Sequence, residues 1–91
     1  MKCGDIVRYI GDERARSIAN DIGLIKWASL PYSEKDCGIV LYERIKKKSI
    51  VDGTIDINMI CVRMSRVYFN NLPPFIYHAD ETFFDFELER V

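Results

Sequence analysis

Residues 57–64 read Ile57-Asn58-Met59-Ile60-Cys61-Val62-Arg63-Met64, and this stretch decides the fold. Its centre is apolar at every position from Met59 to Val62, so both faces of an extended chain would be apolar there. A strand that is apolar on both faces is typical of the middle of a sheet. The sequence therefore predicts a central strand, with Cys61 as a small buried apolar side chain.

On its N-terminal side this strand is preceded by a hairpin signal and a second strand. Asp52-Gly53 is a favoured two-residue hairpin loop, and β-branched residues flank it on both sides. The stretch Gly38-Ile39-Val40-Leu41-Tyr42-Glu43-Arg44-Ile45 predicts a strand, which leads into a basic turn at Lys46-Lys47-Lys48.

On its C-terminal side the chain breaks and then returns to strand patterns. Asn70-Asn71-Leu72-Pro73-Pro74 ends the central strand, because proline cannot join a hydrogen-bonded ladder. Residues 75–79 predict another strand. In the tail, Phe84, Phe86 and Leu88 alternate with Asp85, Glu87 and Glu89, which predicts a half-buried edge strand with a solvated acidic face.

The N-terminal part predicts a first strand and then a long connection. Asp5-Ile6-Val7-Arg8-Tyr9-Ile10 is β-branched and aromatic. Asp12 could cap a short helix that runs to Asn20 and stops before Gly23, although a polar loop fits the same residues. The connection over about residues 11–37 is an insertion between two strands, and residues 24–28 within it do not distinguish helix from strand.

Composition restricts the class of protein. The chain has 91 residues, 48% of them apolar and 30% charged, so we expect residues 1–91 to form a single globular domain. The formal net charge of −1 argues against a protein that coats a polyanion. Three cysteines without paired spacing indicate a reducing compartment, and no signal peptide or long apolar run is visible, so we expect a cytoplasmic protein without membrane contact.

These segments together predict a mostly β domain. Five or six short strands, a long first-loop insertion and one short helix or helical turn favour a small, bent, antiparallel barrel, since closure removes exposed strand edges. Its interior should be packed, leaving function to the rim, the insertion or an edge. The expected core comprises Ile6, Val7, Val40, Leu41, Met59, Cys61, Ile76, Phe84, Phe86 and Leu88.

Three segments resemble a known group of proteins. The chain opens with Gly4-Asp5-Ile6-Val7-Arg8-Tyr9, has Gly38-Ile39-Val40-Leu41-Tyr42-Glu43 in its middle and closes with Phe84-Asp85-Phe86-Glu87-Leu88-Glu89-Arg90-Val91. This order is similar to that of the small SH3-like barrels found among uncharacterised tailed-phage proteins. The resemblance implies an SH3-like fold and a phage origin, which would place the protein in the host cytoplasm. It carries no common reaction.

Function is expected to be binding rather than catalysis. Trp27, Leu30 and Tyr32 lie in the insertion and are the candidate protein-binding residues, through which the chain would bind a host or viral protein. A simpler interpretation is that Trp27 and its apolar neighbours close the barrel mouth.

Two alternatives to this role remain open. Lys46, Lys47 and Lys48, with Arg63 and Arg66, could form a nucleic-acid-binding face, aided by nearby aromatic residues. Equally, the lysines could simply fill an exposed loop. Self-association through the tail strand, which would give a homodimer, is the second alternative.

Catalytic, metal and cofactor sites are not expected. His78 is the only histidine, and it lies in an apolar strand without an obvious partner. The three cysteines lack the close spacing of a zinc site, so a cluster of Cys3, Cys37 and His78 would require the fold to bring distant residues together. Phosphate-binding glycine loops and hydrolase motifs are also missing.

Overall fold

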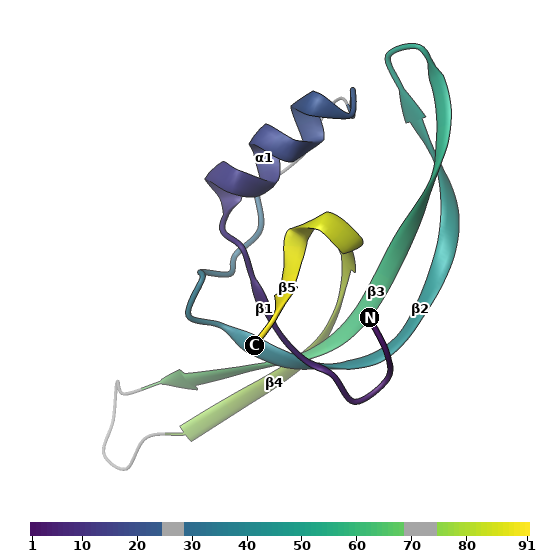
Figure 1. Cartoon of the computed structure of the whole chain (residues 1–91). Coiled ribbons are helices and arrows are strands. Elements are labelled where there is room, and N and C mark those ends of the chain that lie inside the picture. The colour runs from purple at the N-terminus through teal and green to yellow at the C-terminus, as the bar shows by residue number, and fades with distance from the viewer. Residues whose placement is uncertain (25–28, 69–74) are drawn as a thin grey trace.

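A five-stranded antiparallel sheet, one α-helix and one 3-10 turn make up the fold in the computed structural model, which describes residues 1–24, 29–68 and 75–91 (Figure 1). The mostly β prediction and the single short helix are confirmed. The elements are β1 (Ile6–Tyr9), α1 (Asp12–Asp21), β2 (Cys37–Ile50), β3 (Gly53–Tyr68), β4 (Phe75–Phe84), η1 (Asp85–Glu87) and β5 (Leu88–Arg90).

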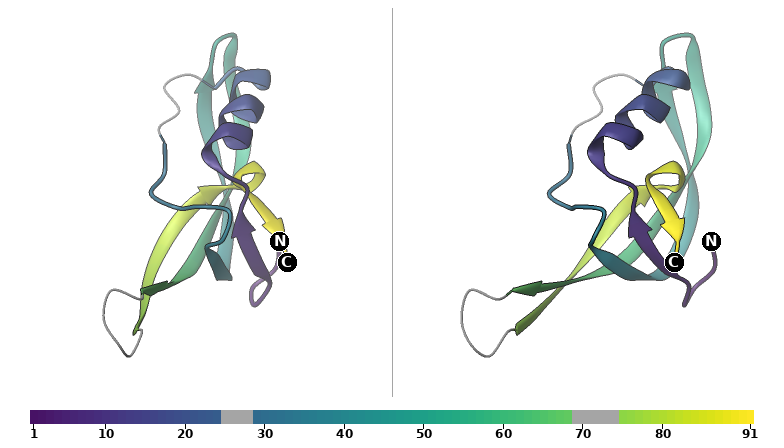
Figure 2. Two further views of the ribbon diagram at one scale, coloured as in Figure 1. Left: turned by 90° about the vertical axis from the view of Figure 1, so that its left-hand side faces the viewer. Right: turned by 60° about the vertical axis from the view of Figure 1, so that its left-hand side comes forward.

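The sheet is curved but open. Its strand order is β4-β3-β2-β1-β5, so the last strand returns beside the first and both ends of the chain lie on the same side of the molecule (Figures 1 and 2). The expected closure into a barrel is not confirmed, because no ladder joins β4 to β5. At the end of β4 the peptide N–H of Phe84 donates to Glu87 Oε1 at 2.7 Å, and the chain turns away through η1.

The strand β3 is an interior strand of the sheet, between β4 and β2, as residues 57–64 predict. From Met59 to Ser65 it is paired on both sides, with β2 and β4, and from Arg66 to Tyr68 it pairs with β4 alone. Its first half, from Gly53 to Asn58, pairs with β2 alone. The hairpin signal is confirmed, since Ile50 and Gly53 are partners across a two-residue loop.

The predicted basic turn is wrong. Lys46, Lys47 and Lys48 lie inside β2, opposite Ile57, Asp56 and Ile55 of β3. The hairpin register determines this outcome, because every residue from Tyr42 to Ile50 has a cross-strand partner. Their side chains therefore alternate between the two faces of a strand rather than gathering at a loop.

The main core lies between the concave face of the sheet, α1 and the segment of the insertion around residues 30–32. Its buried residues are Val7, Tyr9, Ile10, Ala15, Val40, Ile60, Val62, Met64, Phe83 and Leu88. Leu30 and Tyr32 are partly buried against it. A second cluster of Ala19, Leu24, Ile57 and Met59 joins the end of α1 to the β2–β3 hairpin.

Half of the residues expected in the core are buried in the structure. Burial is confirmed for Val7, Val40, Met59, Cys61 and Leu88, whereas Leu41, Phe84 and Phe86 are only half-buried. Ile6 and Ile76 are exposed, with 45% and 58% of their surface accessible. Adjacent strand residues face opposite sides, so Ile6 cannot share the inner face with Val7.

The acidic tail differs from its prediction. Residues 85–87 form η1 rather than a strand, and only Leu88–Arg90 continue as an edge strand beside β1. Side chains three residues apart lie on the same side of a 3-10 turn, which brings Glu87 back under Phe84. As a result Glu87 is 3% exposed, and the expected solvated face of Asp85, Glu87 and Glu89 is wrong for Glu87.

The helix prediction is confirmed, but its start is built differently. Gly11, at φ 98°, precedes the first turn, and no side chain caps it. Asp12 is the first helical residue, and its carboxylate accepts hydrogen bonds from the Tyr9 hydroxyl and, at 3.1 Å, from the Leu30 peptide N–H. Asp12 thereby joins β1, α1 and the insertion. Within the described part of the chain, no helix has the length and apolarity needed to cross a membrane.

Candidate functional site

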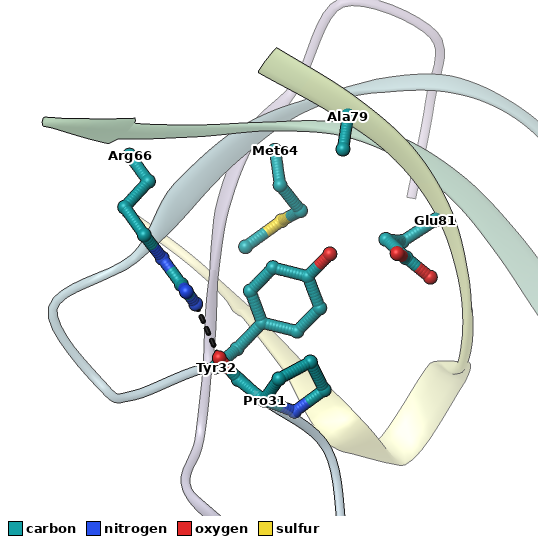
Figure 3. A pocket seen from close by; sticks show the side chains of 6 residues that line it. All are labelled: Pro31, Tyr32, Met64, Arg66, Ala79 and Glu81. Atoms are coloured by element: carbon teal, nitrogen blue, oxygen red, sulfur yellow. Dashed lines mark hydrogen bonds between the residues drawn. The ribbon is translucent and has the colours of Figure 1, made fainter. Parts of the chain in front are cut away.

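A cavity of about 190 Å³ opens where the insertion passes over β3 and β4 (Figure 3). Pro31 and Tyr32 come from the insertion, and the sheet provides the other lining residues, which are Met64, Arg66, Ala79 and Glu81. Met64 and Ala79 are cross-strand partners, so their side chains share one face of the sheet. The cavity thus has an apolar lining with one charged residue on either side of Tyr32.

Tyr32 is held in place by aromatic and cationic contacts. Its ring centroid lies 5.6 Å from that of Phe83, a core residue, and 5.0 Å from the guanidinium carbon of Arg66. Both distances are those of favourable ring–ring and cation–π contacts. One wall of the cavity is therefore anchored to the core.

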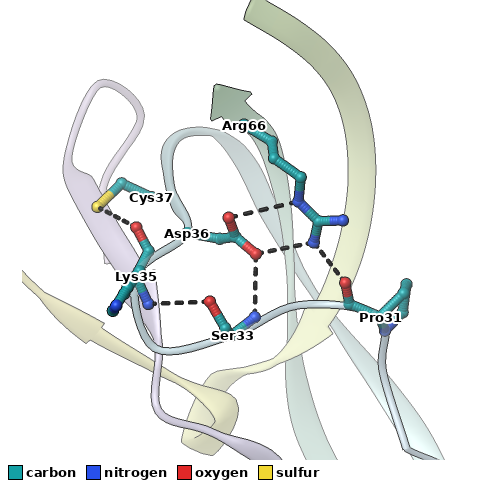
Figure 4. A network of polar contacts seen from close by, with 6 residues as sticks. All are labelled: Pro31, Ser33, Lys35, Asp36, Cys37 and Arg66. Atoms are coloured by element: carbon teal, nitrogen blue, oxygen red, sulfur yellow. Dashed lines mark hydrogen bonds and ion pairs between the residues drawn. The ribbon is translucent and has the colours of Figure 1, made fainter. Parts of the chain in front are cut away.

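Arg66 fastens the insertion to β3 (Figure 4). Its Nη2 lies 2.7 Å from Asp36 Oδ2, its Nε lies 3.4 Å from Asp36 Oδ1, and it also donates to the Pro31 carbonyl. Asp36 in turn accepts a 2.9 Å hydrogen bond from the Ser33 peptide N–H. The positive charge of Arg66 is thus neutralised beside the cavity, and the loop that carries Tyr32 has a defined shape.

Glu81 lies on the opposite side of Tyr32 from Arg66 (Figure 3). Its side chain is half-buried, and no described residue forms a hydrogen bond or ion pair with its carboxylate. Since Arg66 is paired with Asp36, the charge left over in the cavity lining is that of Glu81. The cavity is therefore apolar inside and acidic at one end.

The cavity is too small for an ordinary small-molecule ligand. Ligand pockets usually enclose about 300–1,000 Å³, whereas a single side chain fits the space present here. A long side chain with a cationic head matches the apolar walls along its stem and the Glu81 carboxylate at its end.

Chemical groups for catalysis do not gather in this cavity. Among the residues that the structure describes, no three histidine, cysteine or acidic side chains lie close enough to hold a metal ion. His78 is exposed on the outer face of β4, where its Nδ1 lies 2.9 Å from Ser65 Oγ. Cys3 is exposed, Cys37 is half-buried and Cys61 is buried, and all three are free thiols.

The predicted protein-binding residues are found near the cavity in part. Tyr32 lines it, and Leu30 packs against the main core beside it. Trp27 lies outside the described residues. The sequence did not indicate Met64, Ala79 and Glu81, because their common face follows from the β3–β4 register, in which Met64 faces Ala79 and Val62 faces Glu81.

The candidate nucleic-acid residues do not converge. Lys46 is opposite Ile57 on β3, six positions from Arg63, which corresponds to about 20 Å of extended chain. Lys47 pairs with Asp56 at 3.0 Å, and Lys48 lies 5.7 Å from the centroid of the Phe84 ring.

Arg63 is also neutralised, on the outer face of the sheet. It donates to both carboxylate oxygens of Asp80, at 2.8 and 3.3 Å. This bond raises the pKa of Arg63 and holds the pKa of Asp80 below its usual range. Lys47, Arg63 and Arg66 thus belong to three separate local ion pairs.

Comparison with known proteins gives no relative. The chain matches no protein-family model, and neither a search of curated proteins nor a search of solved structures returned a match.

Proposed function

We propose that this protein is a non-enzymatic accessory protein that binds another protein through the cavity under the insertion. The observation that carries the proposal is an apolar cavity, sized for one side chain, beside the carboxylate of Glu81, which no described residue pairs with. The bound segment would insert a lysine or arginine side chain, since its stem would be covered by Met64 and Tyr32 while its charge meets Glu81.

The finer fold is part of this proposal. We infer an SH3-like barrel whose closure is incomplete between β4 and β5. Support comes from the curvature of the sheet, the return of β5 beside β1 and the helical turn η1 before the last strand. The phage origin rests on the three segments of sequence resemblance alone.

A cavity-filling variant tests the proposal. Ala79→Phe places an aromatic ring in the cavity, whereas Thr82→Phe adds the same ring to the exposed outer face of the same strand. We expect tagged wild-type protein and Thr82→Phe to retain the same protein from nuclease-treated lysate of the cell that produces it, and Ala79→Phe to lose it. Circular dichroism of both variants verifies that the sheet is intact.

Three results would contradict this proposal. Equal retention by Ala79→Phe would place the interface elsewhere. Capture that disappears with nuclease would favour the nucleic-acid alternative, whose affinity would also fall with salt by about one logarithmic unit per phosphate contact. Capture of no protein in any arm would exclude a stable partner under these conditions.

A further inference from the structure

We propose that the free edge of β3, residues 53–58, binds an extended segment of a different protein by strand addition. This surface lies on the β2–β3 hairpin, which projects from the rest of the sheet (Figures 1 and 2). It shares no lining residue with the cavity under the insertion. The ladder between β3 and β4 begins at Met59 and Phe84, so the described residues provide no strand on this side of residues 53–58.

The hairpin register identifies the backbone groups at this edge. Ile50 and Gly53 close the two-residue loop, so their backbone groups face each other. In an antiparallel strand, the backbone N–H and C=O groups of successive residues point alternately toward and away from a neighbouring strand. Those of Thr54, Asp56 and Asn58 therefore point away from β2. A strand placed beside them would continue the sheet where β4 leaves it.

An apolar groove follows this same edge. It has a volume of about 360 Å³, and Ile22, Ile55, Ile57 and Phe86 are among its lining residues. Residues 55–58 of β3 all line it, so the groove follows the strand edge, and Ile45 of β2 extends it onto one face of the hairpin. It offers an added strand apolar contacts for alternate side chains, which is how strand addition gains specificity.

Charge decides which kind of strand fits. Asp56 and Asp85 both line the groove, and among the described residues Lys47 forms an ion pair with Asp56 while none forms one with Asp85, so a negative charge remains. In a second copy of this chain, antiparallel pairing centred on Asp56 would place two Asp56 carboxylates opposite each other, which is destabilising. The occupant is therefore a segment of another protein with alternating apolar and basic side chains.

The experiment uses the isotope-labelled full chain and a synthetic probe, acetyl-Val-Lys-Val-Lys-Val-amide, followed by amide NMR shifts. We expect the shifts to concentrate on residues 53–58, Ile22 and Phe86. The same peptide methylated on every backbone nitrogen should bind at least about tenfold more weakly, since it cannot donate to the edge. A version with glutamate in place of lysine should also bind more weakly at low salt.

Two variants at Asp56 separate the contribution of its backbone N–H to peptide binding from that of its side-chain charge. Asp56→Pro removes the outward N–H, a change that an edge strand tolerates because no ladder bond is lost, and it should weaken binding about tenfold. Asp56→Asn keeps that N–H and should weaken binding by less than about threefold. Ala79→Phe should leave peptide binding unchanged, so this proposal and the proposed function can fail independently.

The inference is overturned if the methylated peptide binds as well as the unmodified one, or if the shifts lie away from residues 53–58. It is also overturned if light scattering without peptide shows a mass that doubles with concentration and the Asp56→Pro change abolishes that doubling. The occupant of the edge would then be a second copy of this chain.

Discussion

The two halves of β3 form one continuous strand in two different surroundings. Residues 59–65 have a strand on each side, and Ile60, Val62 and Met64 are at most 2% exposed. Residues 53–58 have a strand on one side, and Thr54, Asp56 and Gly53 are exposed. The difference teaches that the half whose sequence is apolar on both faces is also the half flanked by two strands, whereas the other half keeps one edge without a described neighbouring strand.

The largest effect should come from truncating a side chain in the doubly paired half. Ile60→Ala removes a fully buried side chain from the main core and should lower the free energy of unfolding by about 3–4 kcal/mol. Ile45→Ala, on the hairpin, removes a side chain that is 68% exposed and should cost less than about 1 kcal/mol. Urea unfolding measures both, and equal losses would contradict the distinction between the halves.

Glu87 provides a second test, at the point where β4 leaves β3. Burial, with a smaller contribution from Asp12, raises its pKa from 4.5 to about 7, against the opposing hydrogen bond from Phe84 N–H. The folded state binds this proton more tightly than the unfolded state, so its contribution to the free energy of unfolding is fully present below pH 4.5 and is lost as the pH rises through 7. The free energy of unfolding should fall by about 3 kcal/mol over this range.

Urea midpoints at several pH values between 4.5 and 8 measure this loss. Glu87→Gln should remove the pH dependence while keeping an acceptor for Phe84 N–H. Asp85→Asn, at an exposed neighbouring carboxylate, should retain the dependence. Identical profiles for wild type and Glu87→Gln would show that another group is responsible.

A smaller effect is expected from Gly38, where β2 meets the doubly paired half of β3. A Cβ at this position would lie 2.7 Å from the Arg63 carbonyl oxygen and 2.9 Å from Met64 Sδ, and closer still to Val62. Gly38→Ala should therefore destabilise the protein by about 2 kcal/mol through overpacking. Ser49→Ala, at an exposed position of the same strand, should be nearly neutral. Thermal unfolding measures the difference in stability between the two variants, and a neutral Gly38→Ala would contradict the prediction.

Much of the sheet could be predicted because its signals are local. The hairpin loop at Asp52-Gly53, the apolar run from Met59 to Val62 and the helix after Gly11 each depend on a few neighbouring residues. The tail could not be predicted, because strict alternation at residues 84–89 fits a strand as well as a strand interrupted by one 3-10 turn. The burial of Glu87 follows from that turn.

The candidate sites depend on the register between neighbouring strands, which cannot be read from the sequence. The lysines at 46–48 suggested a patch with Arg63 and Arg66, but their positions along the β2–β3 ladder keep them apart. The lining of the cavity by Met64, Ala79 and Glu81 arises from the β3–β4 register and from the Arg66–Asp36 pair, which positions the insertion. Each requires knowing which distant residues are opposite each other.

The pairing of β5 with β1 has a consequence for how the chain folds. The strands β2, β3 and β4 follow one another along the chain and join neighbours, whereas Arg8 meets Glu89 from 81 positions away, in a 2.6 Å hydrogen bond. Bringing such distant segments together carries the largest loop-closure entropy in the sheet. Topology therefore favours assembly from the β2–β4 meander outward, with the union of the first and last strands as the non-local step that slows folding.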